Sequence, residues 1–358
     1  MKNIGIITIC DNNNYGNRLQ NYALQEALKK YNFNITTLWN ETSKSSLKRS
    51  LKEMIKKYIL VLKYNKKDIQ RQNIFTNFTN ILLTNTITIY TGNDLNYLND
   101  RYDYFIIGSD QIWNYNFRGK YFGNFEFAMF ADKHKCFSYS ASMGVNKIPN
   151  KKKDVYINGL NHLKYVSVRE ERAKEIAEKL TNRKDVEILI DPTMLLTANE
   201  WDKVSRKPKQ LNFDKYIFNY FLGKLSEIRK KEIERIAKEN NCEIINILDP
   251  KDPFYVCGPS EFLYLEKHAF LICTDSFHSS VFAILYNRPF IVFDREDNIV
   301  NMSSRIDTLI SKFELKDRKF EGQITEKNMN HDYSKAYGIL ETERQKSFDF
   351  LKKALNCD

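Results

Sequence analysis

The sequence predicts two α/β domains, each a doubly wound parallel sheet, that face each other across a cleft. Short apolar runs of strand length alternate with helical periods along the chain, and nearly every run ends in a cluster of polar residues. The 358 residues also correspond to about two domains of ordinary size. Hydrophobic residues make up 42% and charged residues 28%, which excludes a globally disordered chain.

The first half of the chain opens with a strand at 4–9, a polar loop, and a helix at 19–30, where apolar residues recur with helical spacing. Further strands are expected at 34–38, 104–107, 136–141, 165–168 and 187–190. In doubly wound domains, ligands bind at the carboxyl ends of the strands. The polar residues that follow these strands are therefore the candidate site residues.

The second half repeats the alternation. Its strands are expected at 216–221, 243–248, 270–273 and 290–293, and its helices at 226–240, 259–267, 278–286 and 304–312. An amphipathic helix at 341–356 closes the chain. Charge rises near 200–214, where Pro208 interrupts the pattern. The predicted organisation is an N-terminal domain at 1–205, a C-terminal domain at 206–335 and a C-terminal helix at 336–358.

Cysteine usage and the N-terminus indicate the compartment. The six cysteines are scattered and form no C-x-x-C pair, so neither a zinc ribbon nor a redox dithiol is predicted. A chain of this length needs no disulfides to hold its core, and a reducing cytoplasm is the expected location. The first residues turn polar too early for a secretory signal, and no run of about 18 apolar residues predicts a spanning helix.

The formal net charge of +11 favours an anionic substrate or an anionic membrane surface as partner. Nucleic acid is not expected, because the lysines are dispersed along helices and no nucleic-acid-binding motif is present. Residues 44–67 predict a basic amphipathic helix, which can make peripheral contact with the inner membrane face. The alternative is a helix that packs its apolar side on its own domain and leaves its lysines in water.

The first candidate cluster follows the first strand. Asn14 and Asn17 flank Gly16 just before the predicted helix, and amide side chains beside free N–H groups can bind hydroxyls or an anion. The sequence lacks G-x-G-x-x-G there, so no dinucleotide site is predicted. The alternative interpretation is an ordinary turn rich in asparagine.

The turn after the strand at 104–107 contains several different groups that can bind a ligand. Asp110, Gln111 and Trp113 place a carboxylate, an amide and an indole close together, a mixture typical of carbohydrate sites. An acid at a strand end can also act as a general base. The alternative is that Asp110 or its neighbour Ser109 caps a helix.

Two further clusters offer groups that bind anions. Arg169 follows a strand, and arginine binds phosphate or carboxylate through two parallel hydrogen bonds. The alternative is a surface ion pair with an adjacent glutamate. Ser276 and His278 lie where a strand ends and a helix begins, a place where backbone N–H groups hold phosphate and a histidine can transfer a proton. The alternative there is a helix cap beside an incidental histidine.

These clusters, in this order, resemble the polysaccharide pyruvyl transferase family. The matching segments span residues 12–293 and are NNNYGNRLQNYALQEAL, YFIIGSDQIWN, SYSASMG, VSVREERAKEI, DPTMLL and ICTDSFHSSVFAILYNRPFIVF. The resemblance implies a GT-B-like fold with two Rossmann-like domains and the site between them. It also implies an enzyme that moves the enolpyruvyl group of phosphoenolpyruvate onto two hydroxyls of a polysaccharide sugar, forming a pyruvate ketal and releasing phosphate.

The resemblance further implies roles for individual residues. Arg169 matches an arginine linked to donor binding, and His278 matches the histidine of the donor site. The expected catalytic residues are His278 and Asp110. The expected donor-binding residues are Arg169, Ser276, His278, Ser279, Arg295 and Arg305, and the expected acceptor-binding residues are Asn14, Tyr15, Asn17, Gln20, Gln111 and Trp113. Neither a metal nor a cofactor is expected.

The chain departs from the family pattern beside the histidine. Some members carry arginine directly before it and glycine directly after it, where this chain has Phe277 and Ser279. One phosphate-binding cation is therefore missing at that position, and Arg295 or Arg305 is the expected substitute.

Two other functions stay open. A nucleotide-sugar glycosyltransferase of the same architecture would need a nucleotide pocket in the second domain, where Glu261 could bind ribose hydroxyls. A non-catalytic polysaccharide-assembly protein would keep the fold without the activity, and the altered turn around His278 supports it. For the pyruvyl transferase, a lipid-linked sugar at the inner membrane face would suit the basic surface as acceptor.

Overall fold

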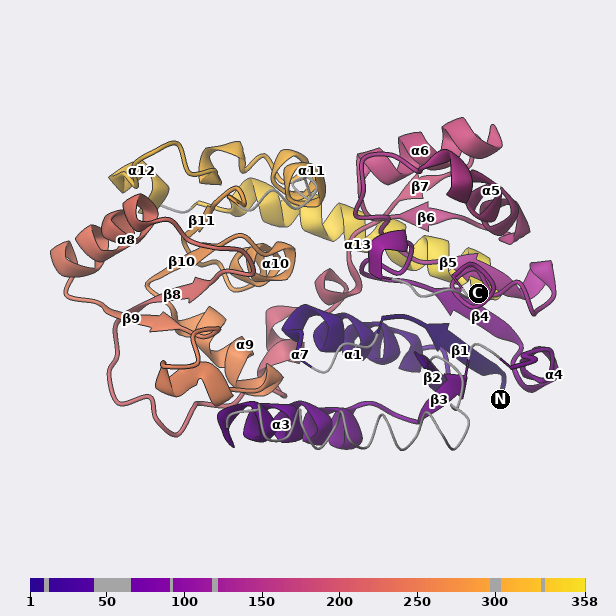
Figure 1. Ribbon diagram of the computed structural model, residues 1–358, viewed down its shortest axis with the longest axis horizontal. Coiled ribbons are helices and arrows are strands. Elements are labelled where there is room, and N and C mark those ends of the chain that lie inside the picture. The colour runs from indigo at the N-terminus through magenta and orange to yellow at the C-terminus, as the bar shows by residue number, and fades with distance from the viewer. Residues whose placement is uncertain are drawn as a thin grey trace.

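The computed structural model describes residues 1–9, 13–41, 66–90, 93–117, 122–296, 304–329 and 332–357. Two α/β units lie side by side in it (Figure 1). The basic helix expected at 44–67 falls almost wholly outside the described residues.

Parallel strands form the sheet of the N-terminal unit. Its main sheet has the order β3-β2-β1-β4-β5, where the strands are β1 (Asn3–Ile7), β2 (Asn34–Glu41), β3 (Thr86–Tyr90), β4 (Tyr104–Ile107) and β5 (Cys136–Ser138). Two short strands, β6 (Ser167–Val168) and β7 (Glu187–Ile188), pair in parallel with each other. Single parallel bridges connect Tyr165 to Phe137 of β5, and Val168 of β6 to Ala141, which follows β5. The carboxyl ends of β4, β6 and β7 therefore lie along one edge.

The C-terminal unit has a second parallel sheet. Its order is β11-β10-β8-β9, with β8 (Tyr216–Tyr220), β9 (Glu243–Asn246), β10 (Leu271–Thr274) and β11 (Phe290–Val292). One face packs Ile217 and Leu271 against Ile233 of helix α8. The opposite face packs Phe218 and Ile272 in the cluster that includes residues of α9 and α10. Helices on both faces of a parallel sheet define a doubly wound unit.

The helices connect these strands and cover them. They are α1 (Tyr15–Lys29), α3 (Lys66–Leu82), α4 (Tyr97–Arg101), α5 (Lys153–His162), α6 (Glu171–Thr181), α7 (Ala198–Asp202), α8 (Glu227–Glu239), α9 (Pro259–His268), α10 (Phe277–Leu285), α11 (Ser304–Lys312), α12 (Glu326–Met329) and α13 (Ser334–Leu355). None of the described helices combines the length and the apolar character that a membrane span requires.

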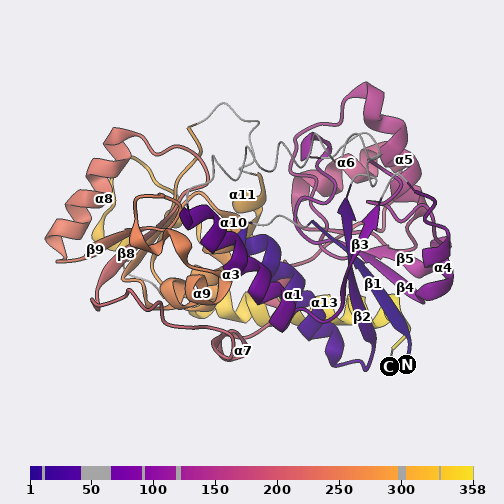
Figure 2. The same ribbon diagram turned by 60° about the horizontal axis from the view of Figure 1, so that its bottom comes forward.

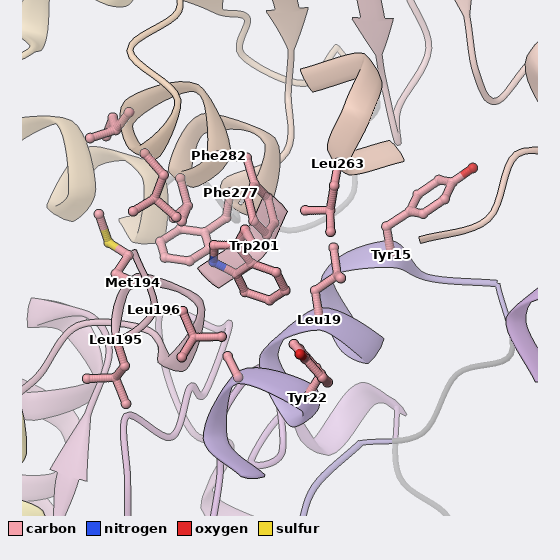
Figure 3. Close-up of a cluster of buried hydrophobic side chains, with 14 of the residues drawn as sticks. Tyr15, Leu19, Tyr22, Met194, Leu195, Leu196, Trp201, Leu263, Phe277 and Phe282 are labelled. Carbon is pink, nitrogen blue, oxygen red and sulfur yellow. The ribbon is translucent and has the colours of Figure 1, made fainter. Parts of the chain in front are cut away.

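An apolar core joins the two units. Figure 3 shows Leu19 and Tyr22 of α1 near Trp201, and Tyr15 of the same helix on the side of Leu263; all five side chains belong to one buried cluster. Helix α13 extends from the C-terminal unit back beneath the N-terminal unit, as Figures 1 and 2 show. The two carboxyl edges are therefore held together by packing.

The expected helices and strands that lie within the described residues are helices and strands in the structure. Some of them begin or end at other residues than expected, for local reasons. The helix expected at 19–30 begins at Tyr15, because Asn14 caps it. The strand expected at 136–141 ends at Ser138, and Ser140 has a left-handed backbone with φ of 50°. The final helix begins at Ser334, several residues before the expected start. Strand β3 and helix α3 were not among the expected elements.

Candidate functional site

Five charged or titratable side chains converge between the two sheets. Asp110, Arg169 and Asp191 follow β4, β6 and β7, whereas His278 and Arg305 come from α10 and α11. All five residues are between 1% and 7% exposed. Buried charges are stable only when they are paired and hydrogen-bonded, so the contacts among them define the site.

Asp191 lies at the centre of this charged cluster. Its Oδ2 accepts hydrogen bonds from Arg169 Nη1 at 2.5 Å and from Ser109 Oγ at 2.9 Å, and it lies 3.6 Å from His278 Nε2. Its Oδ1 accepts a hydrogen bond from the Thr193 N–H at 3.0 Å. One carboxylate therefore fixes the guanidinium of the N-terminal domain and contacts the histidine of the C-terminal domain.

Asp110 occupies an uncommon backbone conformation. Its φ is 59°, in the left-handed region that non-glycine residues rarely adopt. Its Oδ1 accepts a hydrogen bond from Arg169 Nη2 at 3.2 Å and lies 3.8 Å from Arg305 Nη1. Its Oδ2 accepts a hydrogen bond from Asn17 Nδ2 at 3.4 Å. Such backbone outliers cluster at functional sites, where the surrounding structure compensates for their cost.

Both aspartates of the cluster are held in the ionised form. Burial would raise the pKa of Asp191, but His278 and Arg169 lower this pKa well below its usual value. Burial would also raise the pKa of Asp110, and Arg169, His278 and Arg305 lower it. At neutral pH the two carboxylates therefore act as counter-ions and hydrogen-bond acceptors.

The pKa values of the two arginines shift in opposite directions. Burial would lower the pKa of Arg169, but Asp191 and Asp110 raise it. The pKa of Arg305 is lowered to about 10, by burial and by the positive charge of Arg169, although Asp110 opposes this shift. The charged form of Arg305 is thus disfavoured where it lies, and an anion bound beside it would relieve this penalty.

His278 packs against the first turn of α1 in the other domain. A Cβ atom on Gly16 would come within 2.0 Å of the Nδ1 of His278, so a larger residue at position 16 would displace the imidazole. The ring of Phe277 meets the imidazole edge-on, with 5.3 Å between the ring centroids. The imidazole is therefore held on one side by α1 and on another by the acidic centre of the cluster.

Phe277 stands where some family members have arginine, and it supports the cluster in another way. Its ring centroid lies 4.2 Å from the guanidinium carbon of Arg169, a cation–π contact. Of the two expected substitute cations, Arg305 lies in the cluster. Arg295 instead pairs with Asp275, with 3.3 Å between Nε and Oδ2.

The turn before α10 is fastened to the neighbouring loop. The carboxylate of Asp275 accepts hydrogen bonds from the N–H groups of Leu222 and Gly223, each at 2.7 Å. Ser276 is the N-cap residue of α10, and its N–H donates to Thr274 Oγ1 at 3.0 Å. These bonds fix the position from which α10 presents its histidine.

Two predicted acceptor residues lie in apolar cores, so the structure disagrees with their expected exposure. Trp113 is fully buried, stacks on Phe127 and donates from Nε1 to the carbonyl of Glu126. Tyr15 is fully buried as well and stacks on Phe262, with 4.5 Å between the ring centroids. Neither ring is accessible as a platform for a sugar. The expectation for both is wrong, because each side chain points toward its core.

Ser279 was expected to bind the donor, and this is also wrong. Its Oγ donates to Glu266 Oε1 at 2.5 Å, and both residues are fully buried. Burial raises the pKa of Glu266 well above its usual value, although the hydrogen bond from Ser279 opposes the shift. Ser279 therefore fastens α10 to α9 on the side away from the cluster.

The other predicted acceptor residues surround the N-terminal side of the cluster. The side chain of Asn14 caps α1 by accepting a hydrogen bond from the Asn17 N–H at 3.1 Å. Gln20 is buried and accepts a hydrogen bond from the Ser109 N–H at 3.3 Å. Gln111 is half-buried and comes directly after Asp110 in the sequence. Their described bonds shape the turns that present the charged groups.

Two residues of the site had no predicted role. Asp191 follows a predicted strand and begins the DPTMLL segment, so its position at a strand end was the available signal. Gly16 was expected in a loop, and its contact with His278 joins segments of different domains. Local sequence carries no information on that contact.

Comparison with solved structures shows the fold. Sixty-five chains match, among them a putative UDP-N-acetylglucosamine 2-epimerase from Listeria monocytogenes (TM-score 0.54, 11% identity, covering 97% of this chain and 91% of that chain). Others are a UDP-GlcNAc 2-epimerase from Methanocaldococcus jannaschii (TM-score 0.47, 12% identity, 95% and 92% covered) and an α-glucosyltransferase in complex with UDP and DNA (TM-score 0.44, 10% identity, 98% and 95% covered). The likeness to the Listeria protein and the two parallel sheets show a GT-B-like fold with two Rossmann-like domains.

The family follows from the sequence. The family model described as polysaccharide pyruvyl transferase matches residues 14–298. The chain belongs to the polysaccharide pyruvyl transferase family, and is thus a transferase of polysaccharide biosynthesis. The match includes four of the five residues of the charged cluster, and Arg305 lies beyond it. No curated protein matches the chain.

Proposed function

We propose that this protein transfers the enolpyruvyl group of phosphoenolpyruvate onto two hydroxyls of a polysaccharide sugar, forming a pyruvate ketal and releasing phosphate. One observation carries the proposal: two buried arginines and a histidine, contributed by both domains, converge on one point between the sheets. Membership of the polysaccharide pyruvyl transferase family supports the same assignment.

The donor suits the charge of the cluster. Phosphoenolpyruvate carries a carboxylate and a phosphate close together, so its site needs several cationic donors within a small volume. Arg169 and Arg305 both face the same oxygen of Asp110, at 3.2 Å and 3.8 Å. An anionic ligand there would take over hydrogen bonds that Asp110 now accepts and would favour the charged form of Arg305.

The reaction requires one proton to be delivered and two to be removed. Protonation of the methylene carbon makes the adjacent carbon electrophilic, and the first sugar hydroxyl bonds to that carbon and loses its proton. The bond to the phosphate oxygen then breaks, and the second hydroxyl bonds to the same carbon and loses its proton. The methyl group keeps one proton, the other is released, and the phosphate leaves with the electron pair of the broken bond.

His278 is the proposed proton donor or phosphate ligand of this reaction. It is the histidine that the C-terminal domain brings into the cluster, and Gly16 leaves the space for its ring. Asp191, 3.6 Å from its Nε2, is the proposed positioning residue. General acid–base catalysis by one such group typically contributes about 10²–10⁴-fold in rate.

Asp110 is proposed to anchor and orient the acceptor sugar, and Asn17 and Gln111 are proposed to help bind it. The pKa of Asp110 is lowered by its cationic neighbours, which makes its carboxylate a weak base at neutral pH. Its hydrogen bond from Asn17 connects it to the N-terminal turn. The acceptor sugar, carried on a lipid or on a polysaccharide, would then meet the donor from the N-terminal side.

Thermal stabilisation by candidate donors tests the proposal. A ligand at about 100 times its dissociation constant adds roughly 2.7 kcal/mol to the folded state, a readable rise in melting temperature. We expect phosphoenolpyruvate to stabilise the protein, and Arg169→Ala and Arg305→Ala to lose the shift. Arg172→Ala, which changes a 43% exposed arginine side chain, should keep it. Stabilisation by UDP, GDP or CMP instead would contradict the proposal and identify a nucleotide-sugar enzyme.

A further inference from the structure

A pocket of about 470 Å³ opens at the carboxyl ends of β8 and β9, separate from the charged cluster. Apolar side chains of Phe221, Ile233, Ile244 and Leu248 form much of its wall. Ligand pockets are typically of about 300–1,000 Å³ and combine apolar walls with a few placed polar groups. Its position at strand ends is where ligands bind in open parallel sheets.

Asn219 lines the pocket, and one of its buried side-chain atoms has no hydrogen-bond partner among the described residues. Asn219 and Asn246 are register partners in β8 and β9, and Asn219 Nδ2 donates to Asn246 Oδ1 at 2.9 Å. Asn219 is 5% exposed, and its Oδ1 has no hydrogen-bond partner among the described residues. Leaving a buried polar atom unpaired costs free energy. A ligand that donates one hydrogen bond to this amide would recover that cost.

The charges at the rim select against anions. Glu234 and Asp249 line the pocket and are exposed, and Lys230 is paired with Glu227 at 2.5 Å. The rim thus carries more negative than positive charge, whereas in the cluster between the domains two arginines balance two aspartates. An uncharged ligand with hydroxyl donors and an apolar face fits this combination, which is the chemistry of a sugar ring.

The pocket is connected through one loop to the turn that precedes α10, the helix that carries His278. Phe221 lines the pocket, and the next two residues, Leu222 and Gly223, donate to Asp275 immediately before α10. In the sheet, β10 lies on the other side of β8 from β9. Neighbouring strands are about 4.8 Å apart, so the pocket and the end of β10 are separated by roughly 10 Å. An oligosaccharide can extend over this separation.

We propose that this pocket binds a sugar unit of the acceptor that is remote from the reacting hydroxyls; the assignment to the acceptor rests on the proposed function. The remote unit would contribute binding energy and set which polysaccharide is modified. The ligand is recognised by a hydrogen bond to Asn219 and by contact of its C–H face with Phe221 and Leu248.

Two variants should reduce sugar binding and leave donor binding unchanged. The probes are N-acetylglucosamine, galactose and lactose, with phosphoenolpyruvate measured in parallel by thermal shift. We expect at least one sugar to bind the wild type, Asn219→Ala to weaken it about 3- to 10-fold through the lost hydrogen bond, and Leu248→Trp to abolish it by filling the pocket. Both variants should keep the wild-type shift with phosphoenolpyruvate, and the control Leu180→Trp in the other domain should keep both.

Absence of binding by all three sugars, or equal binding in the wild type and both variants, would overturn the inference. A sugar shift that depends on Asn219 and Leu248, in a protein that phosphoenolpyruvate does not stabilise, would uphold the carbohydrate pocket and overturn its assignment to a pyruvyl acceptor. The failure of the proposed function is therefore distinguishable from the failure of the pocket.

Discussion

The carboxyl edges of the two sheets are both lined by polar side chains, and they differ in charge. In the N-terminal domain, Asp110, Arg169 and Asp191 form ion pairs and are at most 6% exposed. In the C-terminal domain, the ends of β8 and β9 carry the neutral amides of Asn219 and Asn246 beside an open pocket. With Arg305 and His278 of the C-terminal domain, the charged edge is the one we propose for a small anion, and the neutral edge is the one we propose for an uncharged hydroxylated ligand.

The difference teaches where each substrate would obtain its binding energy. Ion pairs in a dry site are strong and directional, but they must be desolvated and matched in charge. A neutral pocket depends on contact area and single hydrogen bonds, which are weaker and more tolerant. We therefore expect substitutions at the charged edge to have large effects and those at the neutral edge to have small ones.

The largest expected effect is on catalysis at the charged edge. His278→Ala should reduce turnover of phosphoenolpyruvate by about 10²–10⁴-fold, because a group that transfers a proton or holds phosphate is removed. Phosphate release from phosphoenolpyruvate, measured with purified acceptor, reports the change. His268→Ala is the matched control, since that ring stacks on Tyr264 away from the cluster. Near wild-type turnover in His278→Ala would remove this residue from the reaction.

The next effect is on stability. Asp191→Asn should cost about 3–5 kcal/mol of unfolding free energy, because it leaves the buried charge of Arg169 without its closest partner. Chemical denaturation measures this loss. Asp185→Asn is the control, because its pair with Arg183 involves a 57% exposed carboxylate and should cost at most about 1 kcal/mol. Equal costs in the two variants would contradict the difference between buried and exposed pairs.

The pH dependence of the same variant has a defined sign. The folded-state pKa of Asp191 is lowered, so its stabilising contribution is complete above the unfolded pKa of about 3.9 and is lost as the pH falls below it. The stability gap between wild type and Asp191→Asn should therefore narrow under acid conditions. A gap that widens as the pH falls would contradict this account.

A smaller effect is expected where the domains touch. Gly16→Ala should displace the imidazole of His278 and reduce turnover by roughly 10²-fold, since misplacement by about 1 Å can have this effect. Gly338→Ala is the matched control in α13, where an added Cβ meets no atom of the described residues within 4 Å. That control should keep full turnover and gain about 0.8–1.0 kcal/mol of helix stability. Full turnover in Gly16→Ala would show that the contact does not position the histidine.

The smallest effect concerns the support of α10. The pKa of Glu266 is raised by burial, so the folded state keeps a proton that the unfolded state loses above about pH 4.3. The stability of the wild type relative to Glu266→Gln should therefore fall as the pH rises above this value. Thermal melts at several pH values compare the two, with exposed Glu243→Gln as control. Parallel pH profiles of wild type and Glu266→Gln would contradict the neutral state of Glu266.

Sequence patterns predicted the fold class and part of the site. Alternating apolar runs predicted the strands of both sheets except β3, and polar residues at strand ends predicted Asp110, Arg169 and His278, which the structure brings together. This succeeds because the carboxyl ends of parallel strands meet at one edge. The roles of these residues remain predictions for the experiments above.

The side on which a residue of a helix or turn lies was not predictable from local sequence. Trp113 and Tyr15 belong to motifs beside the site, yet each points into a core. Ser279 follows the histidine directly and faces Glu266, because neighbouring residues of a helix project about 100° apart. Asp191 resembles an ordinary turn cap, and one of its oxygens does cap a turn while the other binds Arg169.

A crystal structure of the protein with phosphoenolpyruvate tests the central claim most directly. The account predicts a ligand between the domains, with its phosphate and carboxylate in contact with Arg169, Arg305 and His278, and with the β8–β9 pocket free of donor. A donor bound in the β8–β9 pocket, or nucleotide density between the domains with no site for phosphoenolpyruvate, would contradict the assignment of the charged edge to the donor.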